Sequence, residues 1–176
     1  MSRYSIRPLA NDDLDLILAW RNHPNIRAVM LSNHEISQQE HKLWFENTKN
    51  NNDRELMICE EEGTPFGFVQ FSGMQNGAGE VDWGFYLSPQ ARPRSGNGLG
   101  ILALEYIFER HKKNEVKSQV FEHNKSSIKF HERLGFKRKP FHVSGMSNDK
   151  KYPLIYFGLK KDEFIKLRNS GVVSVL

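Results

Sequence analysis

Residues 80–100 constrain the fold of this chain more than any other segment. Residues 80–87 place an apolar side chain at every odd position, which predicts a strand with one buried face. Ser95-Gly96-Asn97-Gly98-Leu99-Gly100 follows, and from Gly98 onward the residues are apolar nearly all round, which predicts a buried central helix. Glycines let backbone N–H groups approach a ligand, and a helix N-terminus attracts negative charge. This strand, loop and helix therefore predict a site for a pyrophosphate-bearing ligand.

The glycine loop does not match two common phosphate-binding patterns. A Walker loop requires Gly-Lys-Ser or Gly-Lys-Thr, and neither tripeptide occurs in the chain. A Rossmann loop lies near the start of a strand-helix-strand unit, whereas this loop follows more than half of the chain and a predicted antiparallel meander. We therefore expect neither a P-loop nor a Rossmann fold.

Length and composition predict one domain. The 176 residues are 38% hydrophobic and no Pro/Ser-rich linker divides them, so we expect a domain over residues 1–168 and a C-terminal tail over residues 169–176. The single cysteine, Cys59, excludes an internal disulfide framework and suits a reducing compartment. The N-terminus has no apolar signal-peptide region and no stretch approaches membrane-spanning length. We therefore expect a cytoplasmic protein with no membrane partner.

The remaining sequence alternates predicted strands and helices. Further strands are predicted at residues 4–8, around Leu56 and Ile58, and at residues 66–71, 115–121, 136 onward and 154–159. Capping residues predict three helix starts, at Asn11, Ser37 and Asn124. The helix after Ser37 places four residues on one face: His41, Trp44, Phe45 and Thr48. A short helix is expected after the last strand.

Two stretches resemble motifs of the GCN5-related N-acetyltransferase (GNAT) superfamily. The loop at residues 95–100 resembles its pyrophosphate motif. Residues 124–136, Asn-Lys-Ser-Ser-Ile-Lys-Phe-His-Glu-Arg-Leu-Gly-Phe, resemble its second motif almost position for position. The resemblance implies a single-domain α/β (α+β) GNAT fold, in which helices flank a mixed central sheet of about seven strands with a splay between strands 4 and 5. It also implies acetyl-CoA as co-substrate, an amine as acceptor and no metal.

The resemblance further implies which residues bind acetyl-CoA. Pantetheine is expected to pair as a partial strand with the backbone at Phe85 and Leu87, and Asn124 is expected to hold its end. The superfamily loop usually begins with Gln or Arg where this chain has Ser95, and Arg92 or Arg94 is expected to compensate. The expected cofactor residues are Phe85, Leu87, Arg92, Arg94, Ser95, Gly96, Asn97, Gly98, Leu99, Gly100, Asn124 and Phe130.

The N-terminal third is similar, more narrowly, to the acetyltransferases of the pseudaminic-acid pathway. The similarity lies in Trp20-Arg21-Asn22-His23-Pro24-Asn25, in Met30 and in the helix with His41 and Trp44. These enzymes acetylate the 4-amino group of UDP-4-amino-4,6-dideoxy-N-acetyl-β-L-altrosamine. The implied acceptor residues are Arg21, Met30, His41, Trp44 and Tyr86, because a guanidinium suits phosphate and an aromatic face suits uracil or sugar. Two structural alternatives stay open: Trp44 as a core residue, and Arg21 as a helix-end cap.

The catalytic groups follow less directly from the motifs. The tyrosine common in the second motif, expected to protonate the leaving thiolate, is replaced by His131. We expect His131 to act as that acid, with a satisfied core histidine as the alternative. The resembled family implicates a carboxylate on strand five, but Gln119 stands there and cannot take a proton. For the base we prefer Asp82 over Glu122 and His41, and water alone stays open.

Other acceptors and another class of function also stay open. A ribosomal-protein N-terminus or a polyamine would suit the same fold. Acidic residues in the cleft would favour a polyamine, whereas Arg21, His41 and the net charge of +4 favour an anionic acceptor. The alternative of a different class is a non-catalytic acyl-CoA sensor. Lys and Arg are dispersed rather than striped with aromatic residues, so no nucleic acid is expected. We expect a small-molecule amino-sugar nucleotide as partner and leave a homodimer open.

Overall fold

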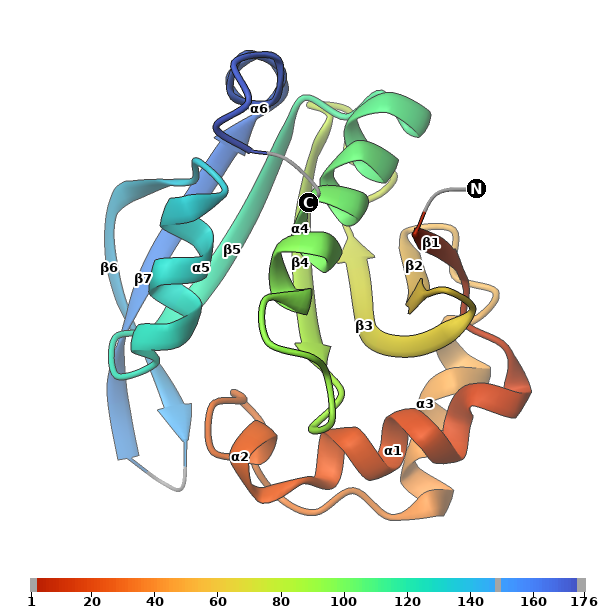
Figure 1. The fold of residues 1–176 in the computed structure, drawn as a ribbon. Helices are drawn as coiled ribbons and strands as arrows, with labels where there is room; N and C mark the ends of the chain where they lie inside the picture. The colour runs from red at the N-terminus through yellow and green to blue at the C-terminus, as the bar shows by residue number, and fades with distance from the viewer. Residues whose placement is uncertain (1–2, 148–149, 174–176) are drawn as a thin grey trace.

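The computed structural model describes residues 3–147 and 150–173, and within them seven strands form one mixed sheet (Figure 1). The order across the sheet is β1-β2-β3-β4-β5-β7-β6, and every neighbouring pair is antiparallel except β4 and β5. The strands are β1 (Tyr4–Pro8), β2 (Arg54–Glu61), β3 (Thr64–Ser72), β4 (Glu80–Leu87), β5 (Glu115–Phe121), β6 (Lys137–Ser147) and β7 (Lys150–Lys160). The predicted mixed sheet is confirmed.

Helices cover both faces of this sheet. They are α1 (Leu14–Asn22), α2 (Pro24–Arg27), α3 (Gln38–Thr48), α4 (Ser95–Glu105), α5 (Lys125–Arg133) and α6 (Lys161–Asn169). On one face, α4, α5 and α6 bury a large core against the sheet, with Leu104, Phe130 and Phe164 among its members. On the other face, α1 and α3 bury a smaller core around Ile17 and Phe45. The two faces therefore have separate hydrophobic cores, divided by the central strands.

The alternation in β4 assigns its side chains to these two cores. Val81 and Trp83 are buried in the larger core and Phe85 packs against it, whereas Tyr86 packs against the smaller one. Successive side chains of a strand point to opposite faces of the sheet, which gives this period of two. The predicted alternation is confirmed, and β4 separates two chemically different environments.

Strands β4 and β5 pair only at their beginning. Their parallel register covers three pairs, Glu80 with Glu115, Val81 with Val116, and Asp82 with Lys117. Beyond this point β5 continues to pair with β7 as far as Phe121, while β4 runs on to Leu87 without a partner on that side. The predicted splay between strands 4 and 5 is confirmed, and it leaves backbone N–H and C=O groups of β4 unpaired by any strand.

Helix α4 begins at Ser95, three positions before the Gly98 start that the apolar pattern predicts. The chain turns into the helix at Arg94, whose φ of 73° lies in the left-handed region. Part of the glycine loop is therefore the first turn of the helix itself. A Cβ at Gly98 would lie 2.9 Å from the Tyr4 ring, and a Cβ at Gly100 would lie 2.5 Å from Leu134. These two glycines allow close packing of α4.

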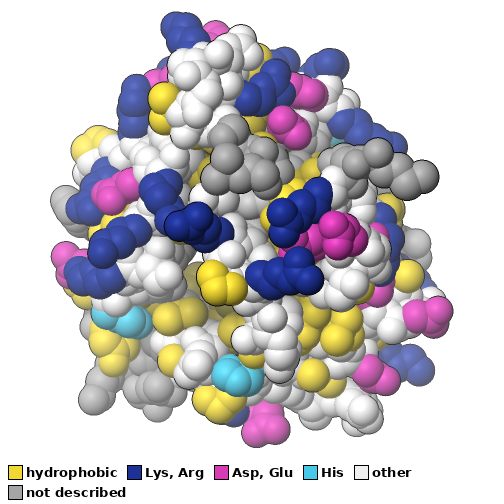
Figure 2. All heavy atoms as spheres, in the orientation of Figure 1, with side chains coloured by type: hydrophobic (Ala, Val, Ile, Leu, Met, Phe, Trp, Pro, Cys, Tyr) yellow, Lys and Arg dark blue, Asp and Glu magenta, His cyan; other side chains and the backbone are white. Residues whose placement is uncertain are grey.

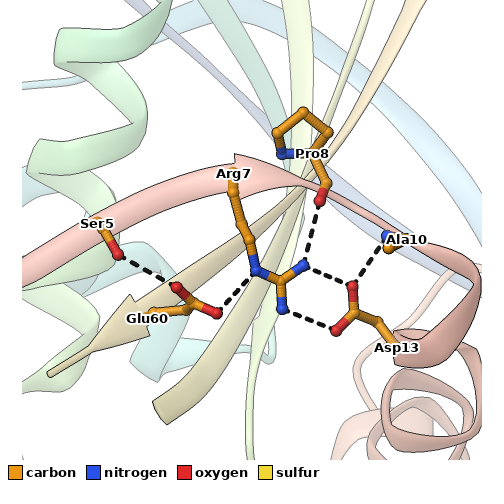
Figure 3. Close-up of polar contacts among 6 residues, drawn as sticks. All are labelled: Ser5, Arg7, Pro8, Ala10, Asp13 and Glu60. Carbon is orange, nitrogen blue, oxygen red and sulfur yellow. Dashed lines mark hydrogen bonds and ion pairs between the residues drawn. The ribbon is translucent and has the colours of Figure 1, made fainter. Parts of the chain in front are cut away.

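The start of α1 also differs from the prediction, which gave the cap to Asn11. Asn11–Asp13 form a short 3₁₀ turn, and the residue that precedes α1 is Asp13. The Asp13 carboxylate makes no bond to the N–H groups of α1 and instead accepts the Ala10 N–H at 2.9 Å. Arg7 of β1 donates two hydrogen bonds to Asp13, at 2.6 and 2.8 Å, and one to Glu60 of β2 at 2.7 Å (Figure 3). Because Arg7 is bonded to both carboxylates, it lowers the pKa of Asp13 and fixes the helix layer to the edge of the sheet.

After α6 the chain turns back onto the larger core. Gly171 has a φ of 75°, and Val173 is buried in that core. The rest of the predicted tail, residues 174–176, lies outside the described residues. No helix in the described ranges has the length and apolar character to cross a lipid bilayer.

Candidate active site

The open side of the splay and the start of α4 form one end of the candidate site. Phe85 and Leu87 of β4 are half-buried beside the splay, and Arg92 and Arg94 are exposed in the segment that leads into α4. In the view of Figure 2, Lys and Arg side chains gather over the middle of the face that carries α4 and α5. Arg92 lies 3.6 Å from the Glu61 carboxylate. Unpaired strand groups, a helix N-terminus and exposed guanidinium groups together suit a ligand with an amide-rich arm and phosphates. The residues present therefore fit acetyl-CoA.

The structure divides the predicted cofactor residues into accessible and buried groups. Accessible or half-buried are Phe85, Leu87, Arg92, Arg94, Gly96, Asn97 and Asn124. Buried are Ser95, Gly98, Leu99, Gly100 and Phe130, and Leu99 and Phe130 belong to the larger core. Asn124 caps α5, because its Oδ1 accepts the Ser127 N–H at 3.1 Å, which confirms the predicted cap and leaves its NH₂ group for another partner.

All five predicted acceptor residues line one pocket on the opposite face of β4. The pocket has a volume of about 230 Å³ and lies between the helical layer of α1 to α3 and strands β3 and β4. Its lining comprises Arg21, Met30, Ile36, Glu40, His41, Trp44, Phe68, Gln70, Gly84, Phe85 and Tyr86. Phe85 lines this pocket and also flanks the splay, so the two halves of the candidate site meet at that residue.

Arg21 is the cation of this pocket. Its Nη2 donates to the carbonyl of Ser32, whereas the buried Nη1 has no hydrogen-bond partner among the described residues. Burial lowers the pKa of Arg21, but an arginine stays charged at neutral pH. A buried donor without a partner is costly, so Nη1 is a ready contact for an acceptor oxygen of a ligand.

His41, Trp44 and Tyr86 form the aromatic part of the pocket. The His41 ring stacks on Trp44 with 5.1 Å between ring centroids, and Trp44 and Tyr86 both pack on Phe68. Burial lowers the pKa of His41 and raises that of the Tyr86 hydroxyl, so both groups are neutral at pH 7. The pocket thus offers flat, uncharged ring surfaces beside one guanidinium.

The segment that joins α2 to α3 forms one wall of this pocket and is tied to α1. Asn22 makes two hydrogen bonds to the backbone of Ile36: Nδ2 donates to its carbonyl at 2.8 Å, and Oδ1 accepts its N–H at 2.9 Å. Arg27 donates to the Asn33 carbonyl at 2.9 Å. These bonds hold residues 28–37, including Met30 and Ile36, over the pocket.

His131 does not have the geometry of the predicted general acid. It is 1% exposed and enclosed by aromatic rings, stacking on Phe157 with 5.1 Å between centroids. Its Nε2 accepts the Trp83 indole N–H at 3.2 Å, so the ring proton sits on Nδ1, which donates to the Ser127 carbonyl at 2.8 Å. Burial lowers the pKa of His131 to about 4. Its ring N–H is thus bonded within α5, and its other nitrogen accepts the Trp83 N–H that joins α5 to β4, as in the core-histidine alternative.

Asp82, the preferred base, lies outside the acceptor pocket. Asp82 is exposed and lies at the end of the splay where β4 and β5 still pair, with Lys117 as its partner on β5. Its side chain is on the same face of β4 as Gly84. Partial burial raises the pKa of Asp82, and the nearby Lys117 opposes this shift. Gln119 is exposed on β5 and also lies outside the pocket. Of the base candidates weighed from the sequence, only His41 lines the pocket.

Several pocket residues carry no clear signal in the sequence. Gln70 and Phe68 belong to a strand that reads as ordinary sheet, and Ile36 and Glu40 flank a helix cap. Their place follows from the register of β3 with β4, in which Gln70 is the partner of Gly84. The alternation of side chains along β3 predicts that Gln70 and Phe68 lie on the same face of the strand. Only the register between β3 and β4 shows that Gln70 lies beside Gly84.

Comparison with known proteins supports the same assignment. The family described as Acetyltransferase (GNAT) domain matches residues 3–137. Acetyltransferase PseH of Campylobacter jejuni subsp. jejuni serotype O:23/36 (strain 81-176) is 24% identical over 132 residues, which cover 73% of this chain and 79% of that protein. PseH of a second C. jejuni strain, serotype O:2, is 25% identical over the same length.

Solved structures with this fold include two that hold the expected co-substrate or its product. Spermidine N-acetyltransferase from Vibrio cholerae, in complex with CoA and spermine, superposes with a TM-score of 0.84 at 17% identity, covering 94% of this chain and 99% of that one. The yncA protein of Salmonella typhimurium, solved with its cofactor acetyl-CoA, gives a TM-score of 0.70 at 20% identity, covering 92% and 96%. Fold, splay and family match together establish that this chain belongs to the GNAT family and is an acetyl-CoA-dependent N-acetyltransferase.

Proposed function

We propose that this enzyme acetylates the 4-amino group of a UDP-linked 4-amino-4,6-dideoxy sugar, a step of pseudaminic-acid biosynthesis for flagellin or surface glycans. The observation that carries the proposal is the convergence of Arg21, Met30, His41, Trp44 and Tyr86 in one pocket that meets the splay at Phe85. The sequence resemblance to the pseudaminic-acid pathway enzymes and the distant likeness to PseH support it.

The charges of the pocket favour an acceptor that carries negative charge. Among its lining residues, Glu40 is the single carboxylate, and it is already bonded to His34 at 2.8 Å. Arg21 contributes a guanidinium with an unused N–H. A polyamine, with several positive charges, needs more carboxylates than this lining offers. A diphosphate-linked sugar suits Arg21, and the deoxy sugar and uracil suit the ring surfaces.

The proposed chemistry is direct attack of the neutral amine on the thioester. The C–N bond forms as the C–S bond breaks, the amine loses one proton, and CoA departs as a thiolate that takes up a proton. A backbone N–H on the unpaired edge of β4 would stabilise the negative charge on the thioester oxygen. Because the His131 proton is engaged by Ser127, we infer that the thiolate is protonated by water.

The proposal predicts turnover with the sugar nucleotide and not with other amines. Free-thiol release from acetyl-CoA is measured with three acceptors: the UDP-4-amino sugar, spermidine and an N-terminal peptide. We expect release with the sugar alone, and a product heavier by one acetyl group in mass spectrometry. Replacing Arg21 by Met is expected to raise the KM for the sugar nucleotide tenfold or more, on the order of the loss of a charged hydrogen bond.

Each other result has a distinct meaning. Turnover with spermidine or the peptide but not with the sugar would disprove the proposed acceptor and leave the acetyltransferase activity in place. Tight acetyl-CoA binding with no release for any acceptor would instead favour the acyl-CoA sensor.

A further inference from the structure

Gln70 lines the acceptor pocket from β3, the strand next to β4 on the side away from the splay. It is half-buried on β3, is the register partner of Gly84 on β4 and lines the pocket together with Phe85. Its side chain lies over Gly84: a Cβ built at Gly84 would be 3.4 Å from Gln70 Nε2 and 3.7 Å from its Cγ. These are van der Waals distances, so the Gln70 amide lies directly above Gly84.

The Gln70 amide, like the Nη1 atom of Arg21, is an unengaged polar group of this pocket. Arg21 Nη2 donates to Ser32, the Glu40 carboxylate is bonded to His34, and the Tyr86 hydroxyl donates to the Ile17 carbonyl at 3.5 Å. The Gln70 side chain makes no hydrogen bond within the described parts of the chain. A half-buried amide that is left without a protein partner is available to a bound ligand.

We propose that the side-chain carbonyl of Gln70 accepts a hydrogen bond from the attacking amine and directs the nitrogen lone pair toward the thioester beside Phe85. This inference rests on the proposed binding of the acceptor in this pocket. As the C–N bond forms, the nitrogen becomes positively charged and its N–H groups become stronger donors. The bond to Gln70 therefore strengthens in the transition state and raises kcat more than it lowers KM. Gln70 takes no proton, and the amine proton leaves to water.

The test replaces Gln70 by Met, which keeps the length of the side chain and removes the acceptor oxygen. We expect kcat to fall about tenfold to a hundredfold, with the KM values for the acceptor and for acetyl-CoA within about threefold of wild type. Gln70→Glu restores an oxygen at the same place and should recover most of the lost kcat.

The matched control is Gln75→Met, the same change at an exposed glutamine that bonds the Asn52 carbonyl and lies outside the pocket. It should leave kcat unchanged. Thermal unfolding of each variant confirms that it folds. A Gln70→Met enzyme with unchanged kcat, or with a loss confined to KM, would overturn the inference.

The outcome is separable from that of the proposed function. Wild-type enzyme is first assayed with the sugar nucleotide, spermidine and the peptide, and every variant is then assayed with the acceptor that wild type uses. If that acceptor is not the sugar, the proposed function fails, while the Gln70 effect on kcat is still measured with the amine that reacts.

Discussion

At the residue scale, His131 shows how one side chain can be fully engaged by the fold. Its two ring nitrogens have opposite roles, because Nε2 accepts from Trp83 of β4 and Nδ1 donates to the Ser127 carbonyl of α5. Protonation of Nε2 would break the first bond and place a charge among aromatic rings. The folded state therefore keeps His131 neutral, and its contribution to stability depends on pH.

The sign of that dependence follows from the lowered pKa. The folded-state pKa of about 4 lies below the ordinary histidine value of 6.5, so the unfolded chain binds more protons between these values. The stabilisation is complete above pH 6.5 and is lost as the pH falls toward 4. From pH 7 to pH 5 this group should cost wild type about 2 kcal/mol of unfolding free energy, measured by urea denaturation.

His131→Phe should remove that part of the pH dependence. It should also lower stability at pH 7 by roughly 2 kcal/mol, because it leaves the buried Trp83 N–H unpaired and removes the side-chain bond to the Ser127 carbonyl. Turnover of the folded variant at pH 7.5 should stay near wild type. A large loss of kcat without unfolding would assign His131 to proton transfer after all.

At the scale of elements, the segment between α2 and α3 is held in place mainly by side chains of α1 and α2. Residues 28–37 contain no helix or strand, and the two bonds from Asn22 to Ile36 replace the backbone pairing of a regular element. Met30 and Ile36, which line the acceptor pocket, depend on this attachment. Acceptor binding should therefore be sensitive to a residue that lies outside the pocket lining.

Asn22→Ala tests this attachment. We expect the KM for the acceptor to rise about threefold to tenfold, because the loosened segment must be ordered again on binding, while the KM for acetyl-CoA stays the same. Asn25→Ala is the matched control, since Asn25 is exposed on α2 and its side chain makes no hydrogen bond in the described structure. Equal effects of the two substitutions on the acceptor KM would contradict the proposed role of Asn22.

At the scale of the whole molecule, the two proposed substrate sites lie on opposite faces of β4 and differ in their electrostatics. Lys and Arg outnumber Asp and Glu by 25 to 21, and basic side chains gather over the face of α4 and α5, where acetyl-CoA is expected to bind. Salt screens interactions between exposed charges far more than those of a half-buried Arg21. Ionic strength should therefore change the KM for acetyl-CoA more than the KM for the acceptor.

Raising the salt to roughly 0.5 M NaCl should increase the KM for acetyl-CoA severalfold. The KM for the acceptor should rise less, and kcat should stay nearly constant. Steady-state kinetics at fixed pH, with each substrate varied in turn, measure these three constants. An equal salt effect on both KM values would contradict the asymmetry between the faces.

Patterns among neighbouring residues predicted the helices and strands of this protein well, but they did not predict which residues of different elements contact one another. The period of two in β4 and the caps at Ser37 and Asn124 are properties of neighbouring residues, and the structure confirms them. The predicted start of α4 was wrong because glycines are typical of loops. In this helix, Gly98 and Gly100 instead allow Tyr4 and Leu134 to pack closely against the backbone. The alignment of Gln70 with Gly84 arises from strand register, which residues far apart in the chain determine together.

The alternation of β4 has a consequence for how acceptor preference could diverge among related genes. Val81 and Trp83 pack in the larger core, on the face that carries α4 and α5. Gly84 and Tyr86 belong to the wall of the acceptor pocket. Because these two pairs occupy opposite faces of one strand, mutations at positions 84 and 86 reshape the pocket wall without replacing a residue of the larger core. A duplicated copy could thus acquire a new amine through a few substitutions while its acetyl donor stays the same.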